Sequence, residues 1–114
     1  AYGGIPAKSL GFFDYSNNNK VYVAWNSSWS NTWIHISITM TDAGLTTIYV
    51  NGQSVASGTV TIYNSGANVT TINVGCSSPG SYGIIGFMDE VFIYNKVLVV
   101  NNIKRLMGSF HPLN

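Results

Sequence analysis

Charged side chains are scarce in this sequence. Asp, Glu, Lys and Arg make up 8% of the 114 residues, and the formal net charge is +1. Beyond the pair Lys104 and Arg105 no basic residues cluster, so the chain lacks the positive patch that binds nucleic acid or an anionic membrane. An apolar content of 46% also excludes the charged type of disordered chain. We therefore expect no nucleic-acid partner.

Cysteine and long apolar runs are also missing. Cys76 is the single cysteine and has no internal disulfide partner, and neither His35 nor His111 stands at a zinc-ligand spacing from it. We expect Cys76 to be a small buried side chain. No stretch approaches the roughly 20 consecutive apolar residues that span a bilayer, and the start shows no signal-like segment. We therefore expect no membrane insertion.

What the chain does contain is glycine, asparagine and serine set among Val, Ile, Thr, Tyr and Trp. This is the composition of short strands joined by tight turns. The length suits one core and not two, so we interpret residues 1–114 as a single all-β domain.

Alternation of apolar and polar residues is clearest over residues 33–40, where Ile34, Ile36, Ile38 and Met40 share one face of the predicted strand. Residues 45–50 and 53–57 flank Asn51-Gly52, which favours a type I′ hairpin. Further strands are predicted at residues 10–14, 21–25, 59–63, 70–75 and 86–94. Apolar spacings of three and four residues predict one short helix over residues 97–107.

Three blocks of the sequence resemble the laminin-G-like family of concanavalin-A-like lectin and glucanase jelly rolls. They are Thr-Trp-Ile-His-Ile-Ser-Ile-Thr at 32–39, Leu-Thr-Thr-Ile-Tyr-Val-Asn-Gly at 45–52, and Gly-Phe-Met-Asp-Glu-Val-Phe-Ile-Tyr-Asn-Lys-Val-Leu at 86–98. The resemblance implies an antiparallel β-sandwich with one short C-terminal helix. Family members normally have further strands upstream, so we expect a sandwich that is incomplete at its N-terminus. The rest of its own polypeptide or another chain would complete it.

Glucanases of the same superfamily need two carboxylates facing each other across the sugar bond. Asp89 and Glu90 are adjacent on a predicted strand and would point to opposite faces, while Asp14 and Asp42 stand in or beside turns. No nucleophile elbow or nucleotide-binding loop is present. We therefore expect a module that is not an enzyme.

Asp89 is the candidate metal ligand, because the resemblance implies a structural calcium ion near a comparable Asp-Glu-Val strand. A carboxylate is a ligand that calcium prefers, but a calcium site needs six to eight oxygens and no Asp-rich loop accompanies Asp89. Two interpretations stay open, a calcium ligand and a carboxylate that hydrogen-bonds loop backbone, and the second is favoured. No other cofactor is expected.

Exposed aromatic rings are the candidate ligand-binding groups, since such modules hold sugars by stacking them on aromatic faces. We select Trp25 and Trp29, which lie in a polar stretch, and Tyr82, which lies in a glycine-rich loop. The alternative is that these rings pack at the rim or contact a neighbouring chain. Trp33 and His35 are interpreted as structural residues of their strand.

Two sequons, at Asn26-Ser-Ser and Asn68-Val-Thr, make Asn26 and Asn68 candidate glycosylation sites. Both stand near predicted loops. In a chain this rich in Asn, Ser and Thr, chance explains much of their presence.

The leading hypothesis is a laminin-G-like module of a surface or extracellular protein, used for adhesion or for binding glycans and glycoproteins. The alternative is a structural protein of a virion, fibre or filament that packs against neighbouring chains and binds no free ligand. Composition favours both equally. Either one places the chain outside the cell, at the cell surface or on a virion surface. Because part of the sandwich would be uncovered, we expect the isolated chain to self-associate.

Overall fold

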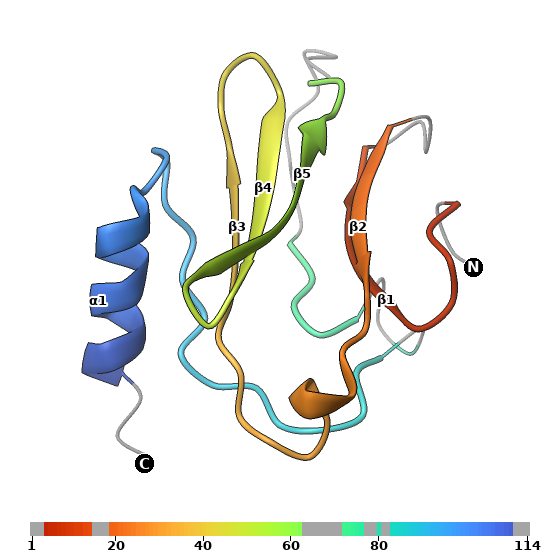
Figure 1. Ribbon diagram of the computed structural model, residues 1–114, viewed down its shortest axis with the longest axis vertical. Coiled ribbons are helices and arrows are strands. Elements are labelled where there is room, and N and C mark those ends of the chain that lie inside the picture. The colour runs from red at the N-terminus through yellow and green to blue at the C-terminus, as the bar shows by residue number, and fades with distance from the viewer. Residues whose placement is uncertain (1–3, 15–18, 63–71, 77–79, 81–82, 111–114) are drawn as a thin grey trace. The chain divides into compact units, whose positions relative to one another are not determined.

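The structure, a computed structural model, describes residues 4–14, 19–62, 72–76, 80 and 83–110 (Figure 1). The chain divides into two compact units, the first made of Ala1–Tyr63 with Lys96–Asn114 and the second of Asn64–Asn95. All assigned helices and strands belong to the first unit. They are β1 (Ser9–Phe13), β2 (Lys20–Ala24), the 3-10 turn η1 (Ser27–Trp29), β3 (Ile36–Met40), β4 (Leu45–Val50), β5 (Gln53–Thr59) and α1 (Val100–Phe110).

The strands pair antiparallel throughout, in one sheet of order β1-β2 and another of order β3-β4-β5. The predicted hairpin between β4 and β5 is confirmed, with Val50 opposite Gln53. Asn51 and Gly52 both have positive φ, at 51° and 78°, as a type I′ turn requires. The expectation of antiparallel sheets with one short C-terminal helix is therefore confirmed.

The core lies where the two sheets meet. Val21 of β2, Ile48 of β4 and Val60 form its buried cluster, with exposed fractions of 3%, 0% and 4%. A Cβ atom on Gly58 would stand 3.0 Å from the Val21 side chain, so the absence of a side chain there allows β2 to approach β5 closely. Burial of each such aliphatic side chain stabilises the fold by about 1.5–3 kcal/mol.

The buried side chain of Asp14 forms hydrogen bonds that connect two segments at one end of this core. Asp14, 6% exposed, accepts hydrogen bonds at Oδ2 from Asn19 Nδ2 (2.9 Å) and from the Thr61 backbone N–H (3.3 Å). Its own backbone N–H donates to the Asn19 carbonyl oxygen at 3.1 Å. The segment after β5 is thereby held against the connection between β1 and β2, and the buried carboxyl group has hydrogen-bond partners.

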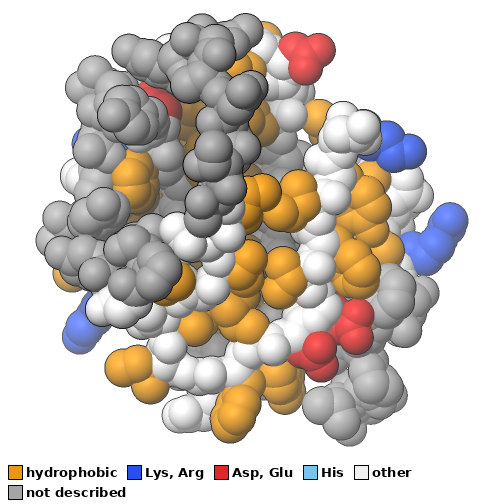
Figure 2. All heavy atoms as spheres, turned by 180° about the vertical axis from the view of Figure 1, so that it is seen from behind, with side chains coloured by type: hydrophobic (Ala, Val, Ile, Leu, Met, Phe, Trp, Pro, Cys, Tyr) orange, Lys and Arg blue, Asp and Glu red, His pale blue; other side chains and the backbone are white. Residues whose placement is uncertain are grey.

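Strand β3 stands at the edge of its sheet and shows a different burial pattern. Its apolar residues Ile36, Ile38 and Met40 have exposed fractions of 42%, 43% and 43%. Their cross-strand partners on β4, which share the same face, are the buried residues Val50, Ile48 and Thr46. The predicted alternation is thus correct in register, but the apolar row of β3 is partly exposed to solvent. Hydrophobic side chains are visible on the molecular surface in Figure 2.

Several predicted elements differ from the structure. Residues 83–95 form no strand, and Glu90 has a φ of 55°, which an extended strand does not allow. A strand needs a neighbour for its backbone, and this segment pairs with none of the described strands. Residues 60–62 and 72–75 also lie outside any strand, and residues 63, 70 and 71 fall outside the described part of the chain.

The helix and the cysteine also differ in detail from their predictions. Helix α1 begins at Val100 and ends at Phe110, three residues later at each end than predicted, and it buries Ile103 to 2% exposure. Cys76 is half-buried instead of buried. None of the helices in the described ranges combines the length and hydropathy needed to cross a membrane.

Candidate functional site: an aromatic loop between β2 and β3

Residues 25–33, here called the aromatic loop, connect β2 to β3 and carry all three tryptophans of the chain. Strand β2 ends at Ala24, and Asn26 begins the 3-10 turn η1 as its N-cap. Asn31 then takes a φ of 57°, a left-handed conformation that asparagine tolerates better than most residues. The loop therefore turns at Asn26 and Asn31, and one tryptophan stands before, one between and one after these two asparagines.

Both ends of the aromatic loop are fastened to neighbouring strands. At its start the Trp25 backbone N–H donates to the Lys8 carbonyl oxygen at 2.8 Å, continuing the β1-β2 ladder. Just after its end, the His35 N–H donates to Asn51 Oδ1 at 2.9 Å and the Asn51 N–H donates to the His35 carbonyl at 2.8 Å. A loop held at both ends loses little further freedom when a ligand binds.

The side chains of Trp25 and Trp29 pack against each other. Their ring centroids lie 5.3 Å apart with the planes at 89°, an edge-to-face contact worth about 0.5–1.5 kcal/mol beyond area burial. The Trp25 Nε1–H also donates to Ser30 Oγ at 2.9 Å, which orients its ring. Trp25 remains 39% exposed while Trp29 is half-buried. Trp25 is thus an oriented, solvent-facing ring supported by a second one.

Asn26 fixes the backbone between these two rings. Its Oδ1 accepts from the Ser28 N–H at 2.9 Å and its carbonyl oxygen accepts from the Trp29 N–H at 3.0 Å. The Ser30 N–H closes the turn on the Ser27 carbonyl at 3.1 Å. The Asn26 side chain is exposed, so its amide Nδ2 faces the same solvent as the exposed Trp25 ring.

The chemistry that the aromatic loop offers is neutral. Its side chains are indole rings, carboxamides and hydroxyls, and it contains no acid, base or thiol. Such groups stack on, and exchange hydrogen bonds with, a polar uncharged ligand. They supply no general acid, general base or nucleophile of shifted pKa.

Of the predicted site residues, the structure brings together Trp25, Trp29 and Asn26. Tyr82 and Asn68 lie outside the described residues. Asp89 belongs to the second unit, is exposed, and accepts at Oδ1 from the Glu90 N–H at 2.9 Å. That bond agrees with the interpretation of a carboxylate that hydrogen-bonds loop backbone. In the ranges that the structure describes, no group of three or more His, Cys, Asp or Glu could hold a metal ion, and a calcium site at Asp89 stays a prediction.

His35 and Trp33, the two residues interpreted as structural, differ in how far they are buried. His35 is half-buried, with its Nδ1 3.2 Å from Ser37 Oγ, and its backbone carries the bonds to Asn51. Trp33 is 46% exposed and adds a further aromatic surface after Asn31. Sequence reasoning missed Asn51 and Ser30 as positioning residues. The Asn51-Gly52 pair signalled only a hairpin, and Ser30 gave no signal among so many serines.

Comparison with known proteins agrees with this architecture. The family model described as the concanavalin A-like lectin/glucanases superfamily matches residues 4–104. Among solved structures, an S-layer domain-containing protein (residues 221–444) from Clostridium thermocellum is similar to the chain, at 20% identity and a TM-score of 0.48. The similarity covers 85% of this chain and 60% of that one. No curated protein matches the chain. With nearly its whole length matched by the family model, and with antiparallel sheets and a closing helix, the chain belongs to the concanavalin A-like lectin/glucanase superfamily.

Proposed function

We propose that this chain is a non-catalytic carbohydrate-binding module of a surface or extracellular protein, and that the aromatic loop contacts the sugar. The observation that carries the proposal is Trp25, a residue that is 39% exposed and whose ring is held by Ser30 and by the Trp29 ring. A ring that is oriented before binding stacks on a sugar with little loss of side-chain entropy.

The groups around Trp25 support the same function. Asn26, Ser27 and Ser28 follow it on η1 and are all exposed, so their amide and hydroxyl groups are available for the hydroxyls of a sugar. Recognition of a sugar needs this combination of one flat apolar face and a few polar groups that fix its orientation.

The positions of the acidic residues support a non-catalytic role. Of the four acids in the chain, Asp14 is buried and bonded to Asn19 and Thr61, while Asp42 is exposed in the turn between β3 and β4. Asp89 and Glu90 are sequence neighbours. Glycoside hydrolysis uses two carboxyl groups on either side of the bond to be cleaved, and the aromatic loop contains none.

A second candidate function is assembly with neighbouring chains, and the edge strand β3 favours it. Its uncharged sequence, Ile-Ser-Ile-Thr-Met, contains no proline, and three of its apolar side chains are exposed. Exposed apolar edge strands pair readily with other chains. Ile38→Lys places a charge in this row. If assembly through β3 is a function, sedimentation velocity should show oligomers for the natural chain and monomers for Ile38→Lys.

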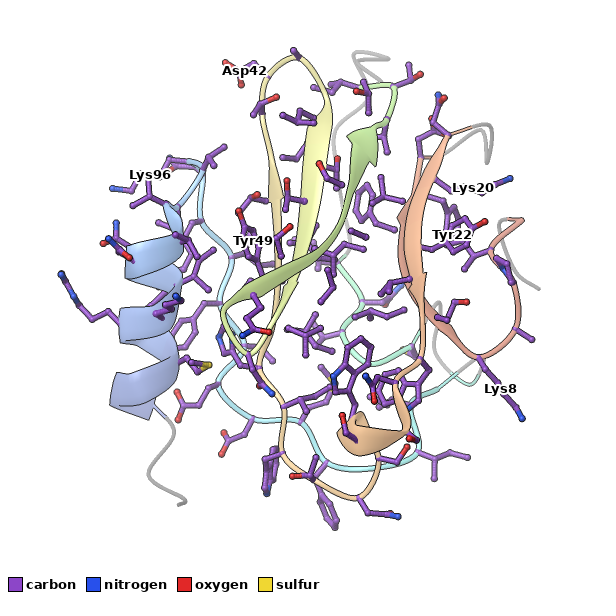
Figure 3. All side chains as sticks on the ribbon, viewed as in Figure 1. Lys8, Lys20, Tyr22, Asp42, Tyr49 and Lys96 are labelled. Carbon is purple, nitrogen blue, oxygen red and sulfur yellow. The ribbon has the colours of Figure 1, made fainter. Side chains whose placement is uncertain are left out.

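The test of carbohydrate binding is a glycan-array screen of the chain beside its Trp25→Ala variant. Tyr22→Ala is the matched control, because Tyr22 is also an exposed aromatic residue, at 44%, and lies away from η1 (Figure 3). Binding that Trp25→Ala loses and Tyr22→Ala keeps supports the proposal. Absence of binding to every glycan, or equal loss in both variants, contradicts it. Thermal melting of each variant establishes that it is folded.

A further inference from the structure

The aromatic loop lies within a long stretch of sequence that has no acidic or strongly basic residue. No Asp, Glu, Lys or Arg stands between Lys20 and Asp42, so most of β2, the whole loop and all of β3 carry no formal charge. His35 is the ionisable group closest to the loop in this stretch, and it is half-buried beside Ser37. A ligand at Trp25 therefore meets neutral groups from the loop itself.

Lys8 is a charged residue whose backbone carbonyl oxygen accepts a hydrogen bond from the Trp25 N–H of the aromatic loop. Its φ of 56° departs from the extended conformation of the strand that follows it. The exposed Lys8 side chain points away from η1 (Figure 3). An ammonium group in water that faces away from the loop gives a bound anion little attraction, and salt screens what remains.

We infer that the aromatic loop selects neutral saccharides and discriminates against uronic, sialic and sulfated ones, an inference that rests on the carbohydrate-binding function proposed above. A neutral pyranose places its C–H face on the Trp25 ring and its hydroxyls near Asn26 and Ser28. A carboxylate or sulfate on the same sugar loses hydration against residues 25–33, none of which has a cationic side chain to offer in return.

The arrangement of the Trp25 and Trp29 rings determines how many sugar residues this pair can contact. Trp25 presents the exposed ring, whereas Trp29 is half-buried and meets it edge to face, so the pair offers one main stacking surface. The Trp25 ring accommodates one sugar residue, and Trp33, 46% exposed, is a separate aromatic surface of the loop. We therefore expect weak binding to a single saccharide and longer retention on a dense neutral polymer, where a protein that dissociates from one sugar rebinds to a neighbouring one at high local concentration.

The experiment is retention of the chain on immobilised polysaccharides at low and high salt. The neutral matrices are laminarin, galactan, mannan and chitin, and the anionic ones are heparin, polygalacturonate and dextran sulfate. The natural chain should be retained on at least one neutral matrix, with no effect of salt. Trp25→Ala should lower that retention at least about tenfold, which corresponds to the loss of a contact of moderate strength.

A gain-of-function variant tests the charge argument separately. Ser28→Arg adds a cation beside Trp25 and keeps the backbone N–H that donates to Asn26 Oδ1. It should acquire retention on the anionic matrices that disappears at high salt. Retention of the natural chain on an anionic matrix, lost with salt, overturns the selection for neutral sugars while leaving carbohydrate binding intact. No retention on any matrix overturns carbohydrate binding itself.

Discussion

Two isoleucines that face each other across the β3-β4 ladder should differ sharply in what they contribute to stability. Ile48 and Ile38 are paired in register and share a face of the sheet, but Ile48 is 0% exposed and Ile38 is 43% exposed. Ile48→Ala removes methyl groups from a closed core and leaves a cavity, so we expect it to lower the free energy of unfolding by about 2–5 kcal/mol. Ile38→Ala removes groups that are already partly in water, so we expect a loss of about 1 kcal/mol.

The assay is urea denaturation followed by tryptophan fluorescence at several protein concentrations, with Ile48→Val as the milder control. We expect Ile48→Val to cost about 0.5–1.5 kcal/mol. The change in unfolding free energy should then fall in the order Ile48→Ala, Ile48→Val and Ile38→Ala, with the last two similar. If Ile38→Ala costs as much as Ile48→Ala, the apolar row of β3 is buried in the folded protein, and the reasoning from its exposure is refuted.

Three further predictions concern Asn51, which holds the aromatic loop, calcium binding at Asp89, and glycosylation of Asn26. Asn51→Ala removes the acceptor for the His35 N–H and a residue suited to positive φ, so it should lower the free energy of unfolding by about 1–2 kcal/mol in the same urea assay. Calcium should leave the melting temperature unchanged, because Asp89 is exposed and already accepts a hydrogen bond from the Glu90 N–H. If calcium raises the melting temperature of the natural chain but not that of Asp89→Asn, Asp89 is a calcium ligand. Secretion from a eukaryotic host should add a glycan to Asn26, seen as a glycosidase-sensitive mass that Asn26→Asp lacks, whereas an unmodified Asn26 in the secreted protein would remove it as a modification site.

The sequence was informative wherever local chemistry decides the structure. The Ile-Ser-Ile-Thr-Met alternation of β3 predicted the residues that share the face of Ile48, and Asn51-Gly52 predicted the hairpin with its two positive φ angles. Period-two patterning and turn chemistry depend on neighbours in sequence, so they can be read directly. The sequence also indicated Trp25 and Trp29 as candidate ligand-binding rings, while their edge-to-face contact is known only from the structure.

Features that depend on contacts between segments far apart in the chain could not be predicted from the sequence. Residues 86–94 have the pattern of a strand, but a pattern does not supply the neighbour that would pair with it, and Glu90 takes a positive φ. The exposure of Ile38 depends on what covers β3, which no local pattern reports. The anchoring of the aromatic loop by Lys8 and Asn51 likewise joins segments that are far apart in the chain.

The proposed site places a bound sugar on the ring of Trp25. The chain has three tryptophans, and their three indole N–H signals in a ¹H–¹⁵N spectrum can be assigned by changing each to Phe in turn. Titration with oligosaccharides of the neutral polymer that retains the chain should shift the Trp25 signal most, because Trp25 is exposed and its ring is oriented by Ser30 and Trp29. It should leave the backbone signal of Tyr22 unmoved. If the Trp25 signal stays in place while residues elsewhere shift, the sugar binds at another surface and the assignment of the site to the aromatic loop is wrong.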